Sequence, residues 1–201
     1  MPLALLTGAG SPHTLVQAQP LGSPTLVFAD SRRAHGSAGV FDLDLLSPVG
    51  VAPVAVECRS NAPSTALLTF NKPVYAPGGL PGAASLAGGG TLSVLSLADY
   101  ELIVDLADVP DGARSTLSFP GIVDGEGNAA LDTLCFGRLT GDVTGDGAVN
   151  IFDLVQVRNR LNQSVGLASM RTDVTGDGAI NIFDLVQVRN HLNQSLVGPC
   201  P

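Results

Sequence analysis

Residues 142–164 read DVTGDGAVNIFDLVQVRNRLNQS, and residues 173–195 read DVTGDGAINIFDLVQVRNHLNQS. The two copies differ only at Val149/Ile180 and Arg160/His191, and the second copy starts 31 residues after the first. Near-identical copies at a fixed period are one structural unit used twice. Each copy places oxygen-bearing side chains at alternate positions and then continues with a helical apolar period. This combination predicts a calcium-binding loop followed by a helix.

Each copy contains a loop of 12 residues that suits a calcium ion, residues 142–153 and 173–184. Ca²⁺ takes about six to eight oxygen ligands, and a loop with ligands at alternate positions can wrap around it. Glycine at the sixth position permits the sharp turn because it adopts positive φ at no steric cost. The sequence therefore predicts two bound Ca²⁺ ions, held by Asp142, Thr144, Asp146, the Ala148 carbonyl, Asn150 and Asp153 in the first loop and by Asp173, Thr175, Asp177, the Ala179 carbonyl, Asn181 and Asp184 in the second.

Two positions of each loop depart from the usual EF-hand pattern. In the first loop, Thr144 offers a neutral hydroxyl where Asp or Asn is common, and Asp153 replaces the longer Glu. Both changes lower the expected affinity toward the range of extracellular modules, about 10⁻⁴ to 10⁻³ M. The alternative is a solvated Asp/Gly turn that binds no metal. Two complete copies, each followed by a capped helix, favour calcium.

A helical pattern follows each loop. Asn150 is a favourable N-cap and Asp153 lies three residues further on, so the two can form a capping box, which Asn181 and Asp184 repeat. Apolar residues at i, i+3 and i+7 then form one face of each helix. The predicted inward face consists of Leu154, Val157 and Leu161 in the first copy and of Leu185, Val188 and Leu192 in the second.

Residues 25–138 show a different period. Apolar and polar residues alternate in short runs that Gly/Pro-rich turns separate, which predicts about six to eight half-buried strands in an antiparallel β-sandwich. Residues 1–24 are rich in Pro, Gly and Ser and predict a linker or disordered terminus. The clearest alternating runs lie at 40–45, 54–59, 100–106 and 116–119.

Two short motifs in this β region resemble bacterial Ig-like domains, which occur in repeats on secreted and surface proteins. They are TFNKPV at 69–74 and the turn DGEGN at 124–128. The resemblance implies an Ig-like β-sandwich over residues 25–138.

The C-terminal repeats carry a second resemblance. No helical pattern precedes the first loop, since GRLTG at 137–141 follows a strand-like run. Two loop–helix units without an entering helix resemble the type I dockerin module, over residues 139–201. The resemblance implies an all-α, non-catalytic docking module that binds cohesin domains in a calcium-dependent way. The near-identity of the copies implies a pseudo-twofold surface that could engage a partner in two orientations.

The dockerin resemblance also indicates where a partner would bind. Cellulosomal dockerins tend to carry a Ser/Thr pair just before the last loop ligand, where this chain has Ile151-Phe152 and Ile182-Phe183. We expect both phenylalanines to pack into the core of this protein and both isoleucines to contact a partner or a neighbouring domain. The expected partner-binding residues are Ile151, Asn159, Arg160, Ile182, Asn190 and His191.

Dockerin termini can be tied together by an aromatic ring stacked on a proline. Phe136 with Pro199 or Pro201 could form such a clasp here, and the alternative is that the tail GPCP is frayed.

Composition argues against several function classes. The net charge is −8, and six loop aspartates supply most of the negative excess. The sequence has no basic stripe that could neutralise nucleic-acid phosphates. No stretch approaches the length of a transmembrane helix. The absence of Trp and the 4% aromatic content weaken a role in gripping polysaccharide. We therefore expect no nucleic acid, no membrane insertion and no small-molecule substrate.

The chain also lacks a recognisable catalytic constellation, which predicts that it is not an enzyme. Glu57 and Glu101 fall on outward strand positions, and Glu126 falls in a turn. His13 and His191 have no obvious nucleophile or metal-ligand partner, and His35 is expected to be a solvent-facing loop residue.

Three cysteines leave two interpretations open. Cys58 and Cys135 form a disulfide if the protein is exported, or each is a buried thiol, while Cys200 is expected to be exposed. The start MPLALL lacks the basic region of a signal peptide, so we expect either a start further upstream or the C-terminal piece of a longer chain.

The sequence thus predicts a mainly β protein with a small α part, which presents a calcium-dependent docking module for a cohesin-like partner outside the cell or on its surface. A link to polysaccharide degradation follows only from the dockerin resemblance. The alternatives are a structural or adhesion protein stiffened by calcium, and the C-terminal part of a larger glycoside hydrolase.

Overall fold

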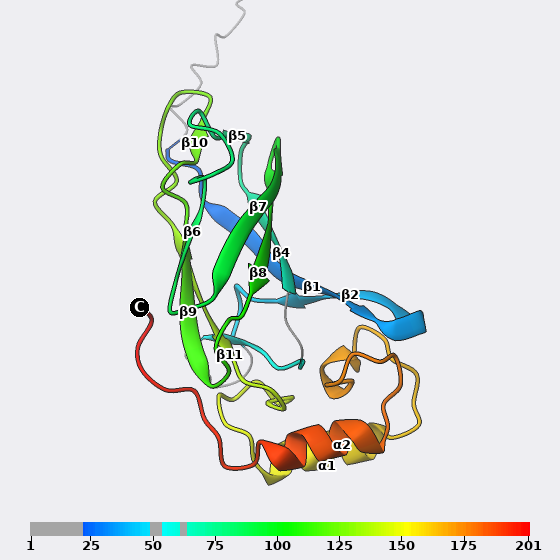
Figure 1. Ribbon diagram of the computed structural model, residues 1–201. Coiled ribbons are helices and arrows are strands. Elements are labelled where there is room, and N and C mark those ends of the chain that lie inside the picture. Colours follow the sequence, from blue (N-terminus) through cyan, green and yellow to red (C-terminus); the bar gives the residue numbers. More distant parts are fainter. Residues whose placement is uncertain (1–21, 49–53, 61–63) are drawn as a thin grey trace, which may run out of the picture.

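The computed structural model describes residues 22–48, 54–60 and 64–201, and these residues form a β-rich body with two helices near the C-terminus (Figure 1). The predicted mainly β class with a small α part is confirmed. His13 and most of the predicted linker 1–24 lie outside the described residues. The strands are β1 (Leu26–His35), β2 (Gly39–Asp44), β3 (Ala55–Glu57), β4 (Ser64–Phe70), β5 (Val74–Tyr75), β6 (Ser85–Ala87), β7 (Thr91–Ala98), β8 (Glu101–Ala107), β9 (Ala113–Ser118), β10 (Val123–Asp124) and β11 (Thr133–Arg138), and the helices are α1 (Ile151–Arg160) and α2 (Ile182–Asn190), with short 3₁₀ turns η1 (Gly36–Ala38) and η2 (Met170–Thr172).

The described strands form two larger sheets, with β5 and β10 as a separate pair. The first sheet has the order β2-β1-β4-β8-β7, and the second has the order β3-β11-β9-β6. Within these sheets, neighbouring strands are antiparallel except β11 and β3, which pair Gly137 with Val56 in parallel. The predicted alternating runs correspond to β2, β3, β8 and β9.

The two sheets share one apolar core. In β8, Leu102, Val104 and Leu106 are buried, as their alternation with polar residues predicts. Phe70 of β4 and Phe119, which follows β9, meet edge to face with ring centroids 5.4 Å apart. Burying such side chains contributes about 1.5–3 kcal/mol each. The Ig-like identity of this two-sheet unit stays a prediction.

Strand β3 departs from the predicted alternation because it is covered on both faces. Glu57, expected to point outward, is buried and forms a salt bridge of 2.6 Å with the buried Arg59. Burial disfavours the charged carboxylate, but the hydrogen bonds and charge of Arg59 outweigh burial and lower the pKa of Glu57 to about 2. The sequence pattern was misleading here because an Arg two residues away can satisfy a buried Glu.

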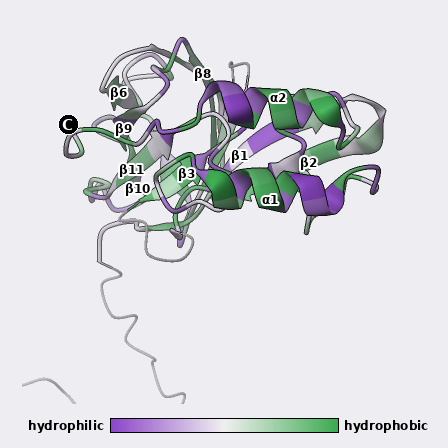
Figure 2. Ribbon diagram, turned by 90° about the horizontal axis from the view of Figure 1, so that it is seen from below, coloured by the Kyte–Doolittle hydropathy of each residue, from purple (hydrophilic) through white to green (hydrophobic). Residues whose placement is uncertain are grey.

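A second apolar core lies under the helices, and β3 borders it through Val56. Val157 of α1 and Val188 of α2 are completely buried at its centre, so the predicted inward faces are confirmed there. The two helices lie side by side (Figure 2), and both lie below the sheets in the view of Figure 1. No helix within the described residues is long and apolar enough to cross a membrane.

Both helices start with the predicted capping box. Asn150 accepts a hydrogen bond from the Phe152 amide, and its own amide donates to Asp153. Asn181, Phe183 and Asp184 repeat these bonds at the start of α2.

The disulfide joins Cys135 and Cys200, and Cys58 is a buried free thiol. The Cys58–Cys135 pairing is therefore corrected, and the alternative of a buried thiol is confirmed for Cys58. Cys200 is exposed as expected, but it is disulfide-bonded. Of the two alternatives for the tail, the Phe136–proline clasp does not fit the structure, because Phe136 is buried in the core of the sheets. Its neighbour Cys135 ties the tail instead. The two cysteines are 65 positions apart in the sequence, and the loop that the disulfide closes contains both repeats.

Breaking this disulfide should destabilise the protein. Cys200→Ser should lower the free energy of unfolding by about 2–4 kcal/mol because the unfolded chain regains the entropy of a long loop. We expect the melting temperature to fall by about 5–10 °C. Calorimetry of Cys200→Ser against the native protein checks this, and Cys58→Ala serves as the cysteine control. Equal stability of the native protein with and without reductant would contradict it.

Candidate metal centre

The first loop, residues 142–153, is built around the carboxylate of Asp142. This side chain is completely buried. Its Oδ1 accepts hydrogen bonds from the amides of Gly145 at 2.7 Å and Asp146 at 3.1 Å, and its Oδ2 accepts from Gly147 at 2.9 Å. The positive φ of Gly147, +86°, aims that amide inward. The first predicted ligand thereby organises the turn that follows it.

Asp153 closes the same loop from its far end. It is also completely buried. Its Oδ1 accepts from the amide and the hydroxyl of Thr144, both at 2.9 Å, and its Oδ2 accepts from the Asn150 amide at 2.8 Å. The carboxylate that caps α1 therefore also binds the start of the loop.

The remaining predicted ligands of the first loop are joined by hydrogen bonds. Asp146 Oδ1 accepts from the Ala148 amide at 2.9 Å, and the Asn150 side-chain amide donates to Asp146 Oδ2 and to the Ala148 carbonyl, each at 3.3 Å. The structure thus brings all six predicted residues into one small loop. The second loop, residues 173–184, repeats the pattern with Asp173, Thr175, Gly176, Asp177, Gly178, Ala179, Asn181 and Asp184.

The donor chemistry of these loops fits a hard cation. Every predicted ligand atom is oxygen, and each loop buries two aspartates completely. Among the described residues, no Lys or Arg forms a salt bridge with a loop carboxylate. Buried carboxylates without a cation are costly, and Ca²⁺ would supply the missing positive charge.

The described residues contain no cluster of three His, Cys, Asp or Glu side chains that could hold a metal ion. Each predicted set reaches six ligands only by adding a hydroxyl, an amide and a backbone carbonyl to three aspartates. The ligand assignment therefore stays a prediction, supported by the bonds within each loop.

The pKa of the first predicted ligand is shifted in opposite directions in the two loops. Burial raises the pKa of Asp142, and the nearby charge of Asp153 adds to the rise, against the Gly147 amide bond. Burial also raises the pKa of Asp184. Burial opposes ionisation of Asp173 as well, but hydrogen bonds from His35 and Gly178 outweigh it and lower the pKa of Asp173.

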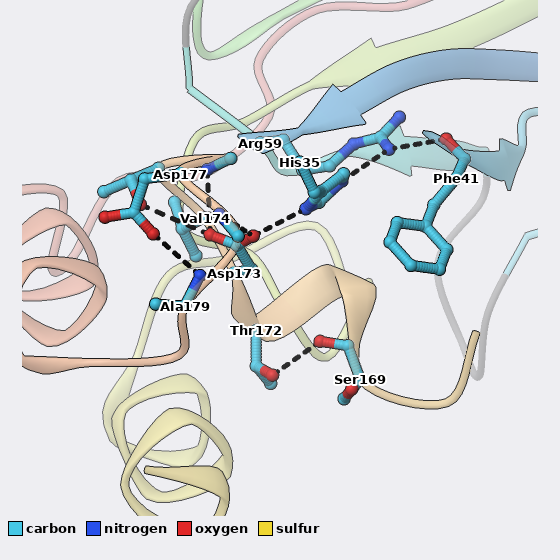
Figure 3. Close-up of polar contacts among 12 residues, drawn as sticks. His35, Phe41, Arg59, Ser169, Thr172, Asp173, Val174, Asp177 and Ala179 are labelled. Carbon is cyan, nitrogen blue, oxygen red and sulfur yellow. Dashed lines mark hydrogen bonds and ion pairs between the residues drawn. The ribbon is translucent and has the colours of Figure 1, made fainter. Parts of the chain in front are cut away.

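The difference arises from His35, which lies at the end of β1. His35 is completely buried, so its expected role as a solvent-facing loop residue is wrong. Its Nδ1 lies 2.8 Å from Asp173 Oδ2, and its Nε2 lies 3.2 Å from Arg59 Nη1 (Figure 3). Sequence reasoning missed this contact because no motif or period connects positions 138 residues apart.

Arg171 of η2 binds the first loop to the sheets. Its Nε donates to the Val143 carbonyl at 2.9 Å and its Nη2 donates to the Asp142 carbonyl at 2.8 Å. Its Nη1 donates to the Val56 carbonyl of β3 at 3.1 Å. One guanidinium therefore links the segment just before the second loop to the first loop and to the two-sheet unit, here called the β unit.

The Ile-Phe pairs lie on the surface. Ile151 and Phe152 are 61% and 68% exposed, and Ile182 and Phe183 are 60% and 65% exposed. The expected core packing of both phenylalanines is therefore wrong. In each helix the N-cap Asn and the third residue, Asp, bond to each other across the first turn, which leaves the two residues between them facing outward.

The other expected partner-binding residues divide into two groups. Asn159 and Asn190 are exposed, whereas Arg160 and His191 are half-buried. His191 Nε2 lies 3.5 Å from Asp111 Oδ2, in the turn between β8 and β9. A groove between the helices is lined by Ile151, Leu154, Val155, Arg158 and Leu185.

Residues 140–193 match the family model of the dockerin type I domain. The matched segment covers both loops and both helices, so the resemblance predicted from the repeats is confirmed there. Domains of this family are calcium-dependent docking modules that bind cohesin partners. No curated protein and no solved structure matches the chain.

The pKa directions predict opposite pH responses with and without metal. Groups with raised pKa values, Asp142 and Asp184, favour folding of the metal-free protein more as the pH falls from 7 toward their ordinary value of 3.8. The lowered pKa of Asp173 removes stability only below that window. With calcium bound, protons compete for the carboxylates, so stability should fall over the same range.

Thermal melts in chelator and in saturating calcium, between pH 7 and about pH 4.5, check this prediction. The two curves should converge as the pH falls, because the carboxylates that hold the ion become protonated. Curves that stay parallel across this range would contradict it. The double variant Asp146→Asn/Asp177→Asn keeps an acceptor oxygen on each side chain. It should reduce the difference in melting temperature between calcium and chelator at every pH.

Proposed function

With residues 140–193 identified as a dockerin type I domain, we propose that this chain is a calcium-dependent protein docking module for a cohesin-like partner. The observation that carries the proposal is the repeated arrangement of a loop closed by two buried aspartates and an outward-facing Ile-Phe pair. Each loop would bind one Ca²⁺ through the six residues predicted for it. The domain itself is non-catalytic, and we propose no enzymatic activity for the chain.

Calcium is coupled to the docking surface through the helix starts. Ile151 and Phe152 stand between Asn150 and Asp153, which are both predicted ligands of the first loop. An ion held by these two residues would fix the first turn of α1 and hence the direction of the two apolar side chains. Removal of the ion would leave buried carboxylates without a cation and loosen the turn.

The proposed docking face consists of the two Ile-Phe pairs and the neighbouring helix residues. Its apolar pairs are equally exposed in the two repeats, which supports engagement of a partner in two orientations. Its members are Ile151, Phe152, Asn159, Arg160, Ile182, Phe183, Asn190 and His191. Apolar side chains in place of a Ser/Thr pair favour a partner with an apolar contact surface.

We further propose that the protein works outside the cell or at its surface. The Cys135–Cys200 disulfide suits an oxidising compartment, and dockerin proteins are typically extracellular. In this proposal residues 25–138 are an Ig-like spacer and residues 139–201 are the docking module. Nucleic acid and membrane insertion have no place in the proposal, and a link to polysaccharide degradation would depend on the protein that carries the module.

A second candidate is a structural or adhesion protein in which calcium only stiffens this end. The disulfide and the Arg171 bonds, which fasten the loops to the sheets, favour it. It shares the calcium response with the first candidate but predicts no cohesin binding. A third candidate, the C-terminal part of a larger glycoside hydrolase, places catalysis elsewhere on that chain and leaves the docking role unchanged.

Calcium should stabilise the helices strongly. At a calcium concentration about a hundredfold above the dissociation constant, each site should add about 2–3 kcal/mol to the free energy of unfolding. Chelator should reduce the helical signal in far-ultraviolet circular dichroism, and added Ca²⁺ should restore it. If neither the spectrum nor the melting temperature changes on addition of chelator or of Ca²⁺, calcium binding is rejected.

Docking is tested by calorimetry against a panel of purified cohesin domains, in Ca²⁺ and in chelator. If two orientations are equivalent, Ile151→Asp or Ile182→Asp alone should weaken binding only about twofold, because one of two modes is lost. The double variant should abolish binding, because each of the two binding orientations would then bury a charged Asp side chain in the interface. Leu131→Asp, an exposed change on the β unit, is the control.

Calcium binding without affinity for any cohesin domain would favour the structural candidate. Unequal effects of the two single variants would reject equivalent orientations while leaving calcium-dependent docking in place.

A further inference from the structure

The two calcium loops are nearly identical in sequence but lie in different surroundings. The second loop faces the tip of the β1–β2 hairpin, whereas the first loop faces the C-terminal tail and Arg171. The close approach of the hairpin tip to the second loop is visible in Figure 3, where His35 points toward Asp173. Because all predicted ligands are the same in the two loops, we look to these neighbours for the difference between the loops.

The backbone of the hairpin tip packs directly against the backbone of the second loop. A Cβ atom on Gly178 would lie 2.6 Å from the His35 carbonyl, and one on Gly36 would collide with the Asp177 carbonyl. The equivalent glycine of the first loop, Gly147, has almost the same φ, +86° against +90°. A Cβ there would meet only a Leu196 methyl at 3.9 Å. The tight packing is specific to the second loop.

The hydrogen bonds at His35 have a defined direction. The Arg59 guanidinium can only donate, so His35 Nε2 at 3.2 Å must accept. His35 Nδ1 then carries the hydrogen and donates to Asp173 Oδ2 at 2.8 Å. Arg59 is held in turn by Glu57, by the Ser31 carbonyl at 2.7 Å and by the Phe41 carbonyl at 3.1 Å.

More bonds hold the second loop to the β unit next to this contact. The amide and hydroxyl of Ser60 donate to the Val174 carbonyl at 2.8 and 3.0 Å. In the first loop, no His, Lys or Arg side chain among the described residues donates to the Asp142 carboxylate. Its protein partners there are the loop's own amides and the Thr144 hydroxyl.

We propose that His35 is a positioning residue for the second calcium loop, and that the β1–β2 hairpin holds this loop in its ligand-presenting shape without metal. The first loop, with the same ligands, depends on the ion for its shape. The second loop therefore binds Ca²⁺ more tightly, because less ordering remains to be done on binding. As calcium falls, the first loop empties first and its half of the docking face is lost first. This inference rests on the proposed calcium-dependent docking.

The test follows each loop separately by nuclear magnetic resonance of the full chain. In the native protein, the Gly178 amide should reach its calcium-saturated shift at a lower Ca²⁺ concentration than the Gly147 amide. In chelator, the Thr175 and Gly178 amides should exchange with solvent more slowly than the Thr144 and Gly147 amides. These comparisons need no substitution, so they decide the proposal even where a variant fails to fold.

Substitution of His35 then assigns the difference. His35→Phe keeps an aromatic ring beside Phe41 but removes the donor, and it should weaken calcium binding of the second loop about tenfold or more. The first loop should change less than twofold. His35→Asn, whose side-chain amide can donate as Nδ1 does, should restore most of the loss. If the role of His35 were purely structural, its substitution would weaken calcium binding of both loops to a similar extent.

Equal affinity and equal exchange of the two loops in the native protein would overturn the proposal, as would a His35→Phe effect shared by both loops. Absence of calcium binding in either loop would instead reject the docking function. In that case, the exchange pattern in chelator would still show whether the hairpin holds the second loop.

Discussion

Four completely buried aspartates, one at each end of each loop, impose the central constraint on the C-terminal half of this protein. Asp142 and Asp153 use their oxygens to fold the first loop and to cap α1, and Asp173 and Asp184 do the same in the second repeat. Backbone amides satisfy much of the hydrogen-bonding capacity of these groups but cannot cancel their charge. In the proposed function, a cation at each loop would resolve this conflict and would also fix the exposed Ile-Phe pairs, because these pairs lie between predicted ligands.

The β unit does more than present the repeats. Strand β3 contributes Val56 to the core under the helices, and its carbonyl accepts a bond from Arg171. The Cys135–Cys200 disulfide returns the tail to β11, next to Phe136 in the core of the sheets. The predicted calcium loops are therefore attached to the β unit by a hydrogen bond and a disulfide that involve no metal. This arrangement supports both a docking module with a defined orientation and the structural alternative.

Features that depend on local interactions could be predicted from the sequence. The capping boxes and the helix faces involve residues at most about a dozen positions apart, and short-range spacing predicts them. The strand runs were also predicted, since alternation shows which face of a strand is buried. The same logic failed at Glu57, because a two-sided strand can bury a charge when Arg59 pairs with it. It failed at Phe152 and Phe183, because the capping geometry and not hydrophobicity decides where the first helical turn points.

By itself, the sequence determined that this protein carries two loop–helix units with calcium-type ligands, since everything each loop needs lies within its own copy. It could not decide how the environments of the two copies differ, because nearly identical sequences predict nearly identical behaviour. Only the tertiary structure placed His35 against Asp173, joined Cys135 to Cys200 and set Arg171 between the first loop and β3. The physical reason is distance along the chain. Contacts between residues 65 to 138 positions apart depend on how whole sheets and loops pack, and no local spacing records that packing.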